Sequence, residues 1–268
     1  MRRGKPPQKD ARVERRPPPR AEAQPELFRR PSPDVVALYG YHAVREALIA
    51  GRRKLLTLYA TPGAAERIAP LAEAAGVTQR IVEPRALASR LGDESVHQGL
   101  LLEARPLPDV DISEIETKSG IVLALDQVTD PHNVGAILRT AAAFAVDALI
   151  LTERHSPELT GVLAKAASGA LEHVPIVSVV NLARALQELT RGGYLVVGLD
   201  SEGPAPLEET VLQKPLALVL GAEGKGLRRL TRERCDVLAR LDMPGPIKSL
   251  NVSNACAAAL TVLRMRLR

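Results

Sequence analysis

Three short polar segments in the second half of this 268-residue chain carry residue types that bind anions and orient polar groups. They are Asp130–Arg139, Gly221–Leu227 and Ser249–Asn254. The first offers an amide and a guanidinium group, the second a carboxylate among glycines, and the third hydroxyl and amide groups. Each borders an apolar run, so each is predicted to be a polar loop on a buried frame. α/β proteins place ligands and chemistry in such loops.

The first segment contains the pattern Asn133-x-Gly135-x-x-x-Arg139. Pro131 and His132 are typical of a helix start, where the Asn133 side chain is able to cap free backbone N–H groups. Gly135 would allow a ligand or another backbone to approach closely. Arg139 would lie in the second helical turn, within reach of a phosphate. Taken singly, Asn133 is equally well explained as a cap, and Arg139 is better explained by a surface ion pair.

The second segment, Gly221–Leu227, combines three glycines with a carboxylate at Glu223. Such glycines indicate unusual backbone dihedral angles or close approach to a ligand, although an ordinary strand-to-helix turn would also explain them. The segment is not a P-loop, because Lys225 is followed by Gly226 instead of Ser or Thr. No G-x-G-x-x-G pattern follows the apolar run that ends at Leu125. The common nucleotide-binding motifs are therefore excluded.

The third segment follows Leu241 and contains Ser249, Leu250 and Asn251. Ser249 and Asn251 are short hydrogen-bonding residues at a predicted helix start, so capping alone would explain them. Together with the second segment, they place the predicted ligand loops late in the chain. An ordinary dinucleotide-binding fold has its phosphate loop after the first strand instead.

Apolar runs alternate with helical periodicity throughout the second half, which predicts a mostly parallel sheet with helices on both faces. The predicted strands cover 121–125, 148–151, 176–180, 195–199, 216–220 and 237–239. The predicted helices cover 134–145, 159–167, 182–191 and 251–267. We therefore expect residues 119–268 to form one α/β domain.

A smaller α/β pattern occupies residues 36–105. Helical periodicity covers 41–50, 64–75 and 85–91, and strand-like runs cover 55–59, 80–82 and 99–103. A segment with two prolines, 106–118, is the predicted linker to the second domain.

The formal charge of +5 is concentrated in residues 1–35, which we expect to be a disordered basic tail. Residues 1–34 hold ten of the 36 Lys and Arg residues and five of the 31 Asp and Glu residues, which leaves 26 of each sign elsewhere. Eight prolines and few apolar residues give too little buried surface to offset the entropy of ordering. The tail is either an arm for RNA phosphates or a solubilising extension. In the first case, deleting it would weaken RNA binding and flatten its salt dependence.

Several classes of protein are disfavoured by composition. Cys235 and Cys256 show neither CxxC spacing nor a cluster with His, so we expect no metal site and no disulfide framework. No apolar run is long enough for a leader or a membrane span, so we expect a soluble, cytoplasmic protein. Aromatic residues make up 2% of the chain and Trp is absent, which argues against base-stacking platforms.

Together, the three segments resemble the motif set of the SpoU (TrmH-type) family of RNA ribose 2′-O-methyltransferases. The resemblance covers residues 37–268, and it includes Leu38–Val44, Asn181–Arg184 and Arg228–Glu233, which are similar to the branch that acts on ribosomal RNA. It implies a SPOUT-type parallel sheet with a C-terminal trefoil knot. It also implies a ribosomal-protein-like α/β substrate-binding domain before that sheet, and a homodimer with its cofactor pocket at the interface.

The resemblance further implies methyl transfer from S-adenosyl-L-methionine to the ribose 2′-hydroxyl of a guanosine in large-subunit (23S) ribosomal RNA. The implied catalytic residues are Asn133, Arg139, Glu223, Ser249 and Asn251. The implied cofactor contacts come from Gly221, Leu241 and Leu250. Because an arginine stays protonated in proteins, we expect Arg139 to position and polarise the hydroxyl beside the phosphate instead of acting as a base.

Two alternatives remain open. One is 2′-O-methylation of tRNA or of another ribosomal nucleotide, such as an adenosine whose methylation confers antibiotic resistance. Family members that act on tRNA usually lack a domain like residues 36–105. The other is a non-catalytic RNA-binding or ribosome-assembly factor that retains the fold. The intact set of five polar motif residues disfavours a pure binder.

Overall fold

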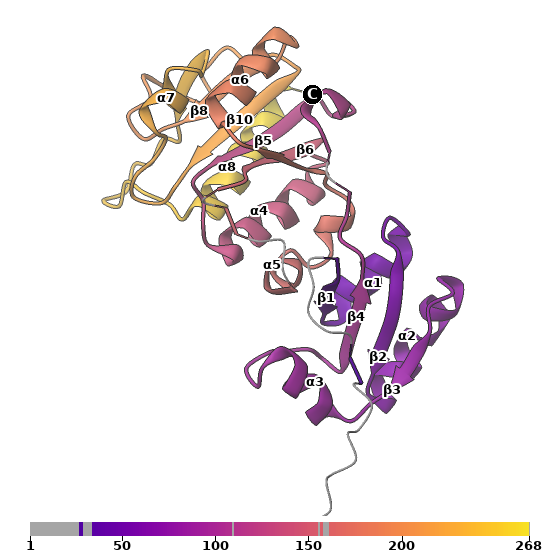
Figure 1. Ribbon diagram of the computed structural model, residues 1–268. Coiled ribbons are helices and arrows are strands. Elements are labelled where there is room, and N and C mark those ends of the chain that lie inside the picture. Colours follow the sequence, from indigo (N-terminus) through magenta and orange to yellow (C-terminus); the bar gives the residue numbers. More distant parts are fainter. Residues whose placement is uncertain (1–26, 29–33, 109, 155, 158–160, 268) are drawn as a thin grey trace, which may run out of the picture. The chain divides into compact units, whose positions relative to one another are not determined.

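The computed structural model describes residues 27–28, 34–108, 110–154, 156–157 and 161–267. The predicted basic tail, residues 1–35, lies almost entirely outside these residues. Pro31–Arg268 form one compact unit that contains two β-sheets (Figure 1).

The first sheet has four strands in the order β1-β4-β2-β3. Its strands are β1 (Val36–Tyr39), β2 (Leu55–Ala60), β3 (Gln79–Ile81) and β4 (Leu100–Ala104), and its helices are α1 (Tyr41–Ala50), α2 (Pro62–Ala74) and α3 (Pro84–Leu91). β4 is antiparallel to β1 and β2, whereas β2 and β3 are parallel. The sequence interpretation missed β1, which is only four residues long and ends beside Gly40. Its partner β4 lies far along the chain, so no local pattern identifies it.

The second sheet has seven strands in the order β7-β6-β5-β10-β8-β11-β9, and every neighbouring pair is parallel. The strands are β5 (Ile121–Asp126), β6 (Ala148–Thr152), β7 (Ile176–Val179), β8 (Leu195–Leu199), β9 (Ala205–Pro206), β10 (Leu216–Gly221) and β11 (Val237–Arg240). The helices are α4 (Pro131–Ala143), α5 (Gly161–Ala166), α6 (Leu182–Arg191), α7 (Arg229–Arg232) and α8 (Val252–Arg266), with short 3-10 turns η1 (Ile112–Glu114) and η2 (Ala170–Glu172). The predicted parallel sheet is therefore confirmed, and β9 and α7 are additional.

Successive residues of the central strands point to two separate hydrophobic clusters. Leu123 and Leu125 of β5 pack in a cluster that includes residues of α4 and α8. Val122 and Ala124 pack in a cluster that includes residues of α6. Because neighbouring residues of a strand face opposite sides of a sheet, helices must cover both faces. Figure 1 shows α4 and α8 on one side of this sheet and α6 on the other.

The parallel direction gathers the carboxyl ends of the strands at one edge of the sheet. β10 lies between β5 and β8, and β11 lies on the other side of β8. The loops that follow Leu199, Gly221 and Arg240 therefore meet at this edge, although they are distant in sequence. Two of the three polar segments are brought together in this way.

Candidate active site

A cavity of about 220 Å³, the strand-end cavity, lies at the carboxyl ends of β8, β10 and β11. Its apolar wall includes Leu199, Leu220 and Leu241, which stand at or next to the ends of these three strands. The glycine-rich loop and residues 248–250 also line this cavity. The sequence-predicted residues that line it are Gly221, Glu223, Leu241, Ser249 and Leu250.

The glycine-rich loop after β10 closes on itself. The Gly226 N–H donates to the Ala222 carbonyl oxygen at 2.8 Å, and a Cβ atom on Gly221 would overlap the backbone of Gly226 and Leu227. Gly224 and Gly226 have φ values of +75° and +64°, in the left-handed region that favours glycine. The first glycine therefore permits a close approach of backbone to backbone, and the other two permit the turn.

Asn251 connects the strand-end cavity to α4. As the N-cap of α8, it uses Oδ1 to accept the Ser253 N–H at 2.9 Å and the Ser253 hydroxyl at 2.6 Å. These donors fix the amide orientation, so the Asn251 nitrogen points the other way and donates to Asn133 Oδ1 at 2.9 Å. Within the described part of the chain, the Asn133 side-chain nitrogen makes no hydrogen bond. That nitrogen is therefore available to donate to a ligand.

The start of α4 differs from the prediction, and this changes the role of Asn133. The helix begins at Pro131, and its N-cap is Asp130, whose carboxylate accepts the His132 N–H at 2.9 Å. The alternative explanation of Asn133 as the helix cap is therefore excluded. Pro131 already has the φ value of a first helical residue, so the helix starts earlier and Asn133 lies inside the first turn.

Farther along α4, Gly135 and Arg139 make no contribution to the strand-end cavity. Gly135 faces α5, where a Cβ atom would overlap the side chain of Ala166. Arg139 is exposed and lines a different cavity of about 400 Å³, together with Ser168 and His173. Its side chain forms no ion pair or hydrogen bond with any residue that the structure describes. One copy of the chain thus groups four of the five predicted catalytic side chains at or beside the strand-end cavity and leaves Arg139 apart.

Asp200 and Ser201 also line the strand-end cavity, and the sequence interpretation did not include them. The Asp200 carboxylate is nearly buried; it accepts the Glu202 N–H at 2.9 Å and lies 3.3 Å from Arg232 Nε. Their signal in the sequence is an Asp-Ser pair directly after the apolar run 195–199. Because β8 lies between β10 and β11 in the sheet, and parallel strands end at the same edge, this pair lies near the other two loops.

Two further ionisable groups line the strand-end cavity. Lys248 Nζ donates to the Met243 carbonyl oxygen, so it is engaged within its own loop. Glu223 is exposed and forms no ion pair with the residues that are described. An unpaired carboxylate at this position is able to accept hydrogen bonds from the hydroxyl, amine or amide groups of a ligand.

The described residues offer little to other kinds of chemistry. No group of three or more His, Cys, Asp or Glu among them is arranged to hold a metal ion, and none of their helices is long and apolar enough to cross a membrane. Burial raises the pKa of both Cys235 and Cys256 to about 12. Both thiols therefore stay protonated at neutral pH and are poor nucleophiles.

Two protein-family models match the chain. The model of the SpoU rRNA Methylase family matches residues 120–261, which include the parallel sheet and the strand-end cavity. A model described as RNA 2′-O ribose methyltransferase substrate binding matches residues 37–110, which include the four-stranded sheet except its first residue, Val36.

Individual proteins of known name are similar over most of the chain. The 23S rRNA (guanosine-2′-O-)-methyltransferase RlmB of Pasteurella multocida (strain Pm70) is 41% identical over 241 residues, covering 86% of this chain and 98% of the relative. RlmB of Pseudomonas aeruginosa is 42% identical over 238 residues, covering 85% and 96%.

Solved structures have the same fold. The SpoU methyltransferase AviRb from Streptomyces viridochromogenes, in complex with the cofactor AdoMet, matches with a TM-score of 0.74 at 22% identity and covers 87% of this chain and 91% of that one. An AdoMet-bound rRNA methyltransferase from Sinorhizobium meliloti matches with a TM-score of 0.75 at 24% identity and covers 88% of each chain.

Proposed function

Because the chain belongs to the SpoU rRNA methylase family, we propose that it transfers a methyl group from S-adenosyl-L-methionine to the ribose 2′-hydroxyl of a guanosine in 23S ribosomal RNA. The observation that carries this proposal is the extent of the likeness to the two RlmB proteins. They are 41% and 42% identical to this chain, and the match covers 98% and 96% of their own lengths. All three polar segments lie within the residues matched by the methylase model.

The strand-end cavity is the proposed site for S-adenosyl-L-methionine. Its wall of Leu199, Leu220 and Leu241 suits the flat faces of an adenine ring, and the backbone of Gly221 and Leu250 offers polar groups to the edges of the ligand. The glycine-rich loop leaves part of the wall without side chains, as a nucleoside-sized ligand requires. When bound, S-adenosyl-L-methionine supplies the electrophilic methyl group.

The polar side chains beside this cavity are proposed to orient the ribose. The free amide nitrogen of Asn133 donates to a ribose or phosphate oxygen, and Asn251 holds Asn133 in that orientation. Ser249 and Glu223 line the cavity and offer a hydroxyl and a carboxylate to the ribose hydroxyl groups. In this proposal Asn251 is a positioning residue, since its own oxygen and nitrogen are both used within the protein.

Arg139 is proposed to reach the strand-end cavity of a second copy of the chain, in a homodimer. Its exposure, its lack of a partner among the described residues and its place in a different cavity support this arrangement. Its guanidinium group would bind the phosphate next to the reacting ribose and polarise the 2′-hydroxyl. Each active site would then combine Asn133, Glu223, Ser249 and Asn251 with an arginine from the other subunit.

The proposal includes a trefoil knot near the C-terminus. β11 lies between β8 and β9 in the sheet, although β10 precedes it in the chain. After β11 the chain returns, and α8 packs against both α4 and β10. A path that leaves the centre of a sheet and comes back across it supports such a crossing, which is rare among proteins.

The remaining parts of the chain are proposed to bind the RNA. The α/β domain of residues 36–105 would recognise the substrate, as the description of the model that matches residues 37–110 suggests. Residues 106–118 would link it to the methyltransferase domain, residues 119–268. The tail, residues 1–35, would add contacts to phosphates through its excess of Lys and Arg. The protein would act in the cytoplasm, where its ribosomal RNA substrate is found.

The direct test is methyl transfer in solution. Full-length protein is incubated with a 23S ribosomal RNA transcript and radiolabelled S-adenosyl-L-methionine, and the RNA is then digested to nucleosides. We expect label in 2′-O-methylguanosine, and none when Ser249→Ala replaces the wild type. Label in another nucleoside, or only in a tRNA transcript, would contradict the proposed substrate. Tight RNA binding without any methyl transfer would contradict the enzymatic function.

A further inference from the structure

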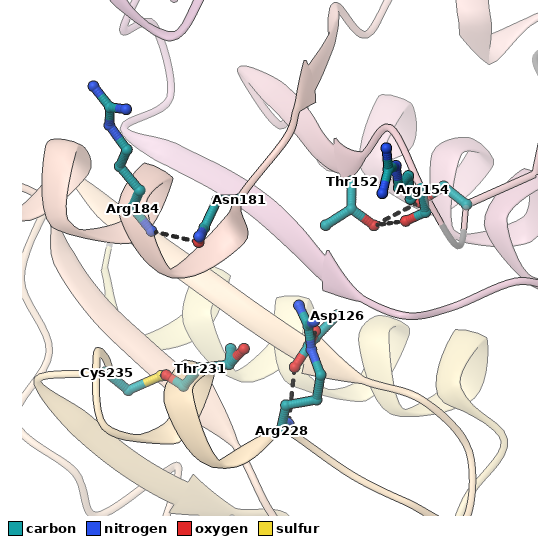
Figure 2. A network of polar contacts seen from close by, with 9 residues as sticks. Asp126, Thr152, Arg154, Asn181, Arg184, Arg228, Thr231 and Cys235 are labelled. Carbon is teal, nitrogen blue, oxygen red and sulfur yellow. Dashed lines mark hydrogen bonds and ion pairs between the residues drawn. The ribbon is translucent and has the colours of Figure 1, made fainter.

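A second cavity lies at the same edge of the parallel sheet, between α6 and α7, and the proposed mechanism does not use it. This α6–α7 pocket has a volume of about 440 Å³. The residues that line it include Arg154, Val180, Asn181, Arg228, Arg229 and Leu230. Three segments form it: the residues after β6, the start of α6 and the start of α7. Figure 2 shows Arg154, Asn181 and Arg228 on these separate segments.

Arg228 is held in place by a buried carboxylate. Asp126, which is 1% exposed, accepts the Arg228 backbone N–H at 2.8 Å and its Nε–H at 2.6 Å (Figure 2). The two terminal nitrogens of Arg228 make no hydrogen bond to any described residue, and the side chain is 46% exposed. The guanidinium fork is thus fixed on one side and free on the other. A fork fixed in this way is prepared to bind a phosphate with two nitrogens.

The other charges of the α6–α7 pocket are also positive. Arg154 is exposed, and its side chain forms no ion pair with the described residues, while its carbonyl oxygen accepts the Thr152 hydroxyl at 2.6 Å. Arg229 pairs with Glu233 at 2.6 Å, an exposed i,i+4 pair of small energetic value. No Asp or Glu is among the described residues that line the pocket. The pocket therefore suits an anionic ligand.

Two exposed apolar side chains stand among these arginines. Val180 is 79% exposed and Leu230 is 51% exposed, and both line the α6–α7 pocket. Exposed apolar side chains in the lining are not explained by solvation of the charges alone. A nucleotide does match both features, because its phosphate pairs with guanidinium groups and its base or ribose packs on apolar side chains.

The α6–α7 pocket and the strand-end cavity are lined by neighbouring parts of the same backbone segments. Gly221, which lines the strand-end cavity, is the register partner of Asp126 on the neighbouring strand. The loop that begins at Gly221 lines the strand-end cavity with its residues up to Gly226. The residues that follow, starting with Arg228, line the α6–α7 pocket. An RNA strand whose ribose enters the first cavity can therefore continue to the second.

We propose that the α6–α7 pocket binds a phosphodiester and the adjoining nucleoside of the RNA substrate, close to the nucleotide that is methylated. This proposal rests on the proposed function, because it takes the ligand to be the same RNA. Arg228 and Arg154 bind the phosphate, and Val180 and Leu230 contact the nucleoside.

The test measures binding of full-length protein to a 23S ribosomal RNA transcript at several salt concentrations. Arg154→Ala should weaken binding several-fold and lower the slope of log affinity against log salt by about one, since one phosphate contact is lost. Leu230→Ser should weaken binding without changing that slope. Arg191→Ala is the matched control, because Arg191 is exposed at the opposite end of α6. It should bind as the wild type does, and all three variants should keep wild-type affinity for S-adenosyl-L-methionine.

Wild-type RNA affinity and salt slope in both Arg154→Ala and Leu230→Ser would overturn the proposal and would leave the α6–α7 pocket to a different ligand, such as an acidic protein segment. The result is independent of catalysis. If wild-type protein methylates the RNA but Arg154→Ala and Leu230→Ser bind it normally, only the subsite is wrong. If wild-type protein never methylates it and these variants still bind it more weakly, only the proposed function is wrong.

Discussion

The side-chain nitrogen of Asn251 donates to Asn133 Oδ1 at 2.9 Å, and this bond ties the start of α8 to the first turn of α4. Asn251 Oδ1 meanwhile caps α8 through the Ser253 N–H. An amide can serve both partners because it presents an acceptor on one side and a donor on the other. Through this one side chain, the third polar segment fixes the orientation of a residue in the first.

Replacing Asn251 with Asp separates these two roles. The new carboxylate still accepts the Ser253 N–H, so the cap remains, but it has no donor for Asn133. Asn133 then turns its own nitrogen towards the carboxylate and is lost to the substrate. We expect methyl transfer to fall on the order of a hundredfold, as for other lost active-site donors.

The free energy of unfolding in urea should change by less than about 1 kcal/mol in Asn251→Asp, because the cap is kept. Asn251→Ala is the contrast, since it removes the cap as well and should cost about 1 kcal/mol. Methyl transfer at the wild-type rate in Asn251→Asp would show that the Asn133 nitrogen has no part in the reaction.

Replacement by Ala should have different effects at Gly221 and at Gly224. In Gly221→Ala the new Cβ atom overlaps the backbone of Gly226 and Leu227, so the loop that lines the strand-end cavity must move. We expect affinity for S-adenosyl-L-methionine, measured by calorimetry, to fall at least tenfold, or about 1.4 kcal/mol. At Gly224 a Cβ atom meets open space, and only the left-handed φ is unfavourable, by about 1–3 kcal/mol of stability. Equal effects on cofactor affinity would contradict this reading of the loop.

Arg139 and Ser249 should complement each other between subunits. Arg139→Ala alone should abolish methyl transfer and leave affinity for S-adenosyl-L-methionine largely intact, because in the proposed dimer its guanidinium group binds the RNA phosphate and not the methyl donor. Ser249→Ala alone should also be inactive. In a mixed dimer of the two variants, one site carries both changes and the other carries neither, so co-expression should restore activity. Failure of every mixture to recover activity would place both groups in sites formed by a single chain.

Cys256 should make stability depend on pH in alkaline solution. Burial raises the pKa of its thiol to about 12, from an ordinary value of 9.0. Between these values the unfolded chain has lost the proton and the native chain has kept it, so the free energy of unfolding falls as pH rises. Urea unfolding followed from pH 8 upwards should give a shallower decline for Cys256→Ala than for the wild type. Identical slopes would mean that the native thiol ionises normally.

Much of the parallel sheet could be predicted because its strands are buried on both faces. Ile121–Asp126 and Leu216–Gly221 are continuous apolar runs that end in a polar or glycine residue, and such runs are visible without any partner. Their adjacency was not predictable, since β10 lies beside β5 with several elements between them in the chain. Local periodicity contains no information on which strands pair.

The candidate site likewise has features that local sequence predicts and features that depend on long-range packing. The glycine spacing and the polar residues after β10 and β11 led to most of the strand-end cavity, whereas Asp200 and Ser201 joined it only through the strand order. Capping, the alternative explanation of Asn133, is excluded because Asp130 and Pro131 already start the helix. The Asn133–Asn251 bond depends on the packing of α4 against α8, and that packing is a long-range property.

The most direct measurement for the proposed function is a map of ribose 2′-O-methylation in ribosomal RNA from cells with and without this protein. The proposal predicts that one guanosine in 23S ribosomal RNA loses its methyl group in the deletion strain. Wild-type protein should restore that mark, and Arg139→Ala should not. An unchanged methylation pattern in the deletion strain would contradict the proposal.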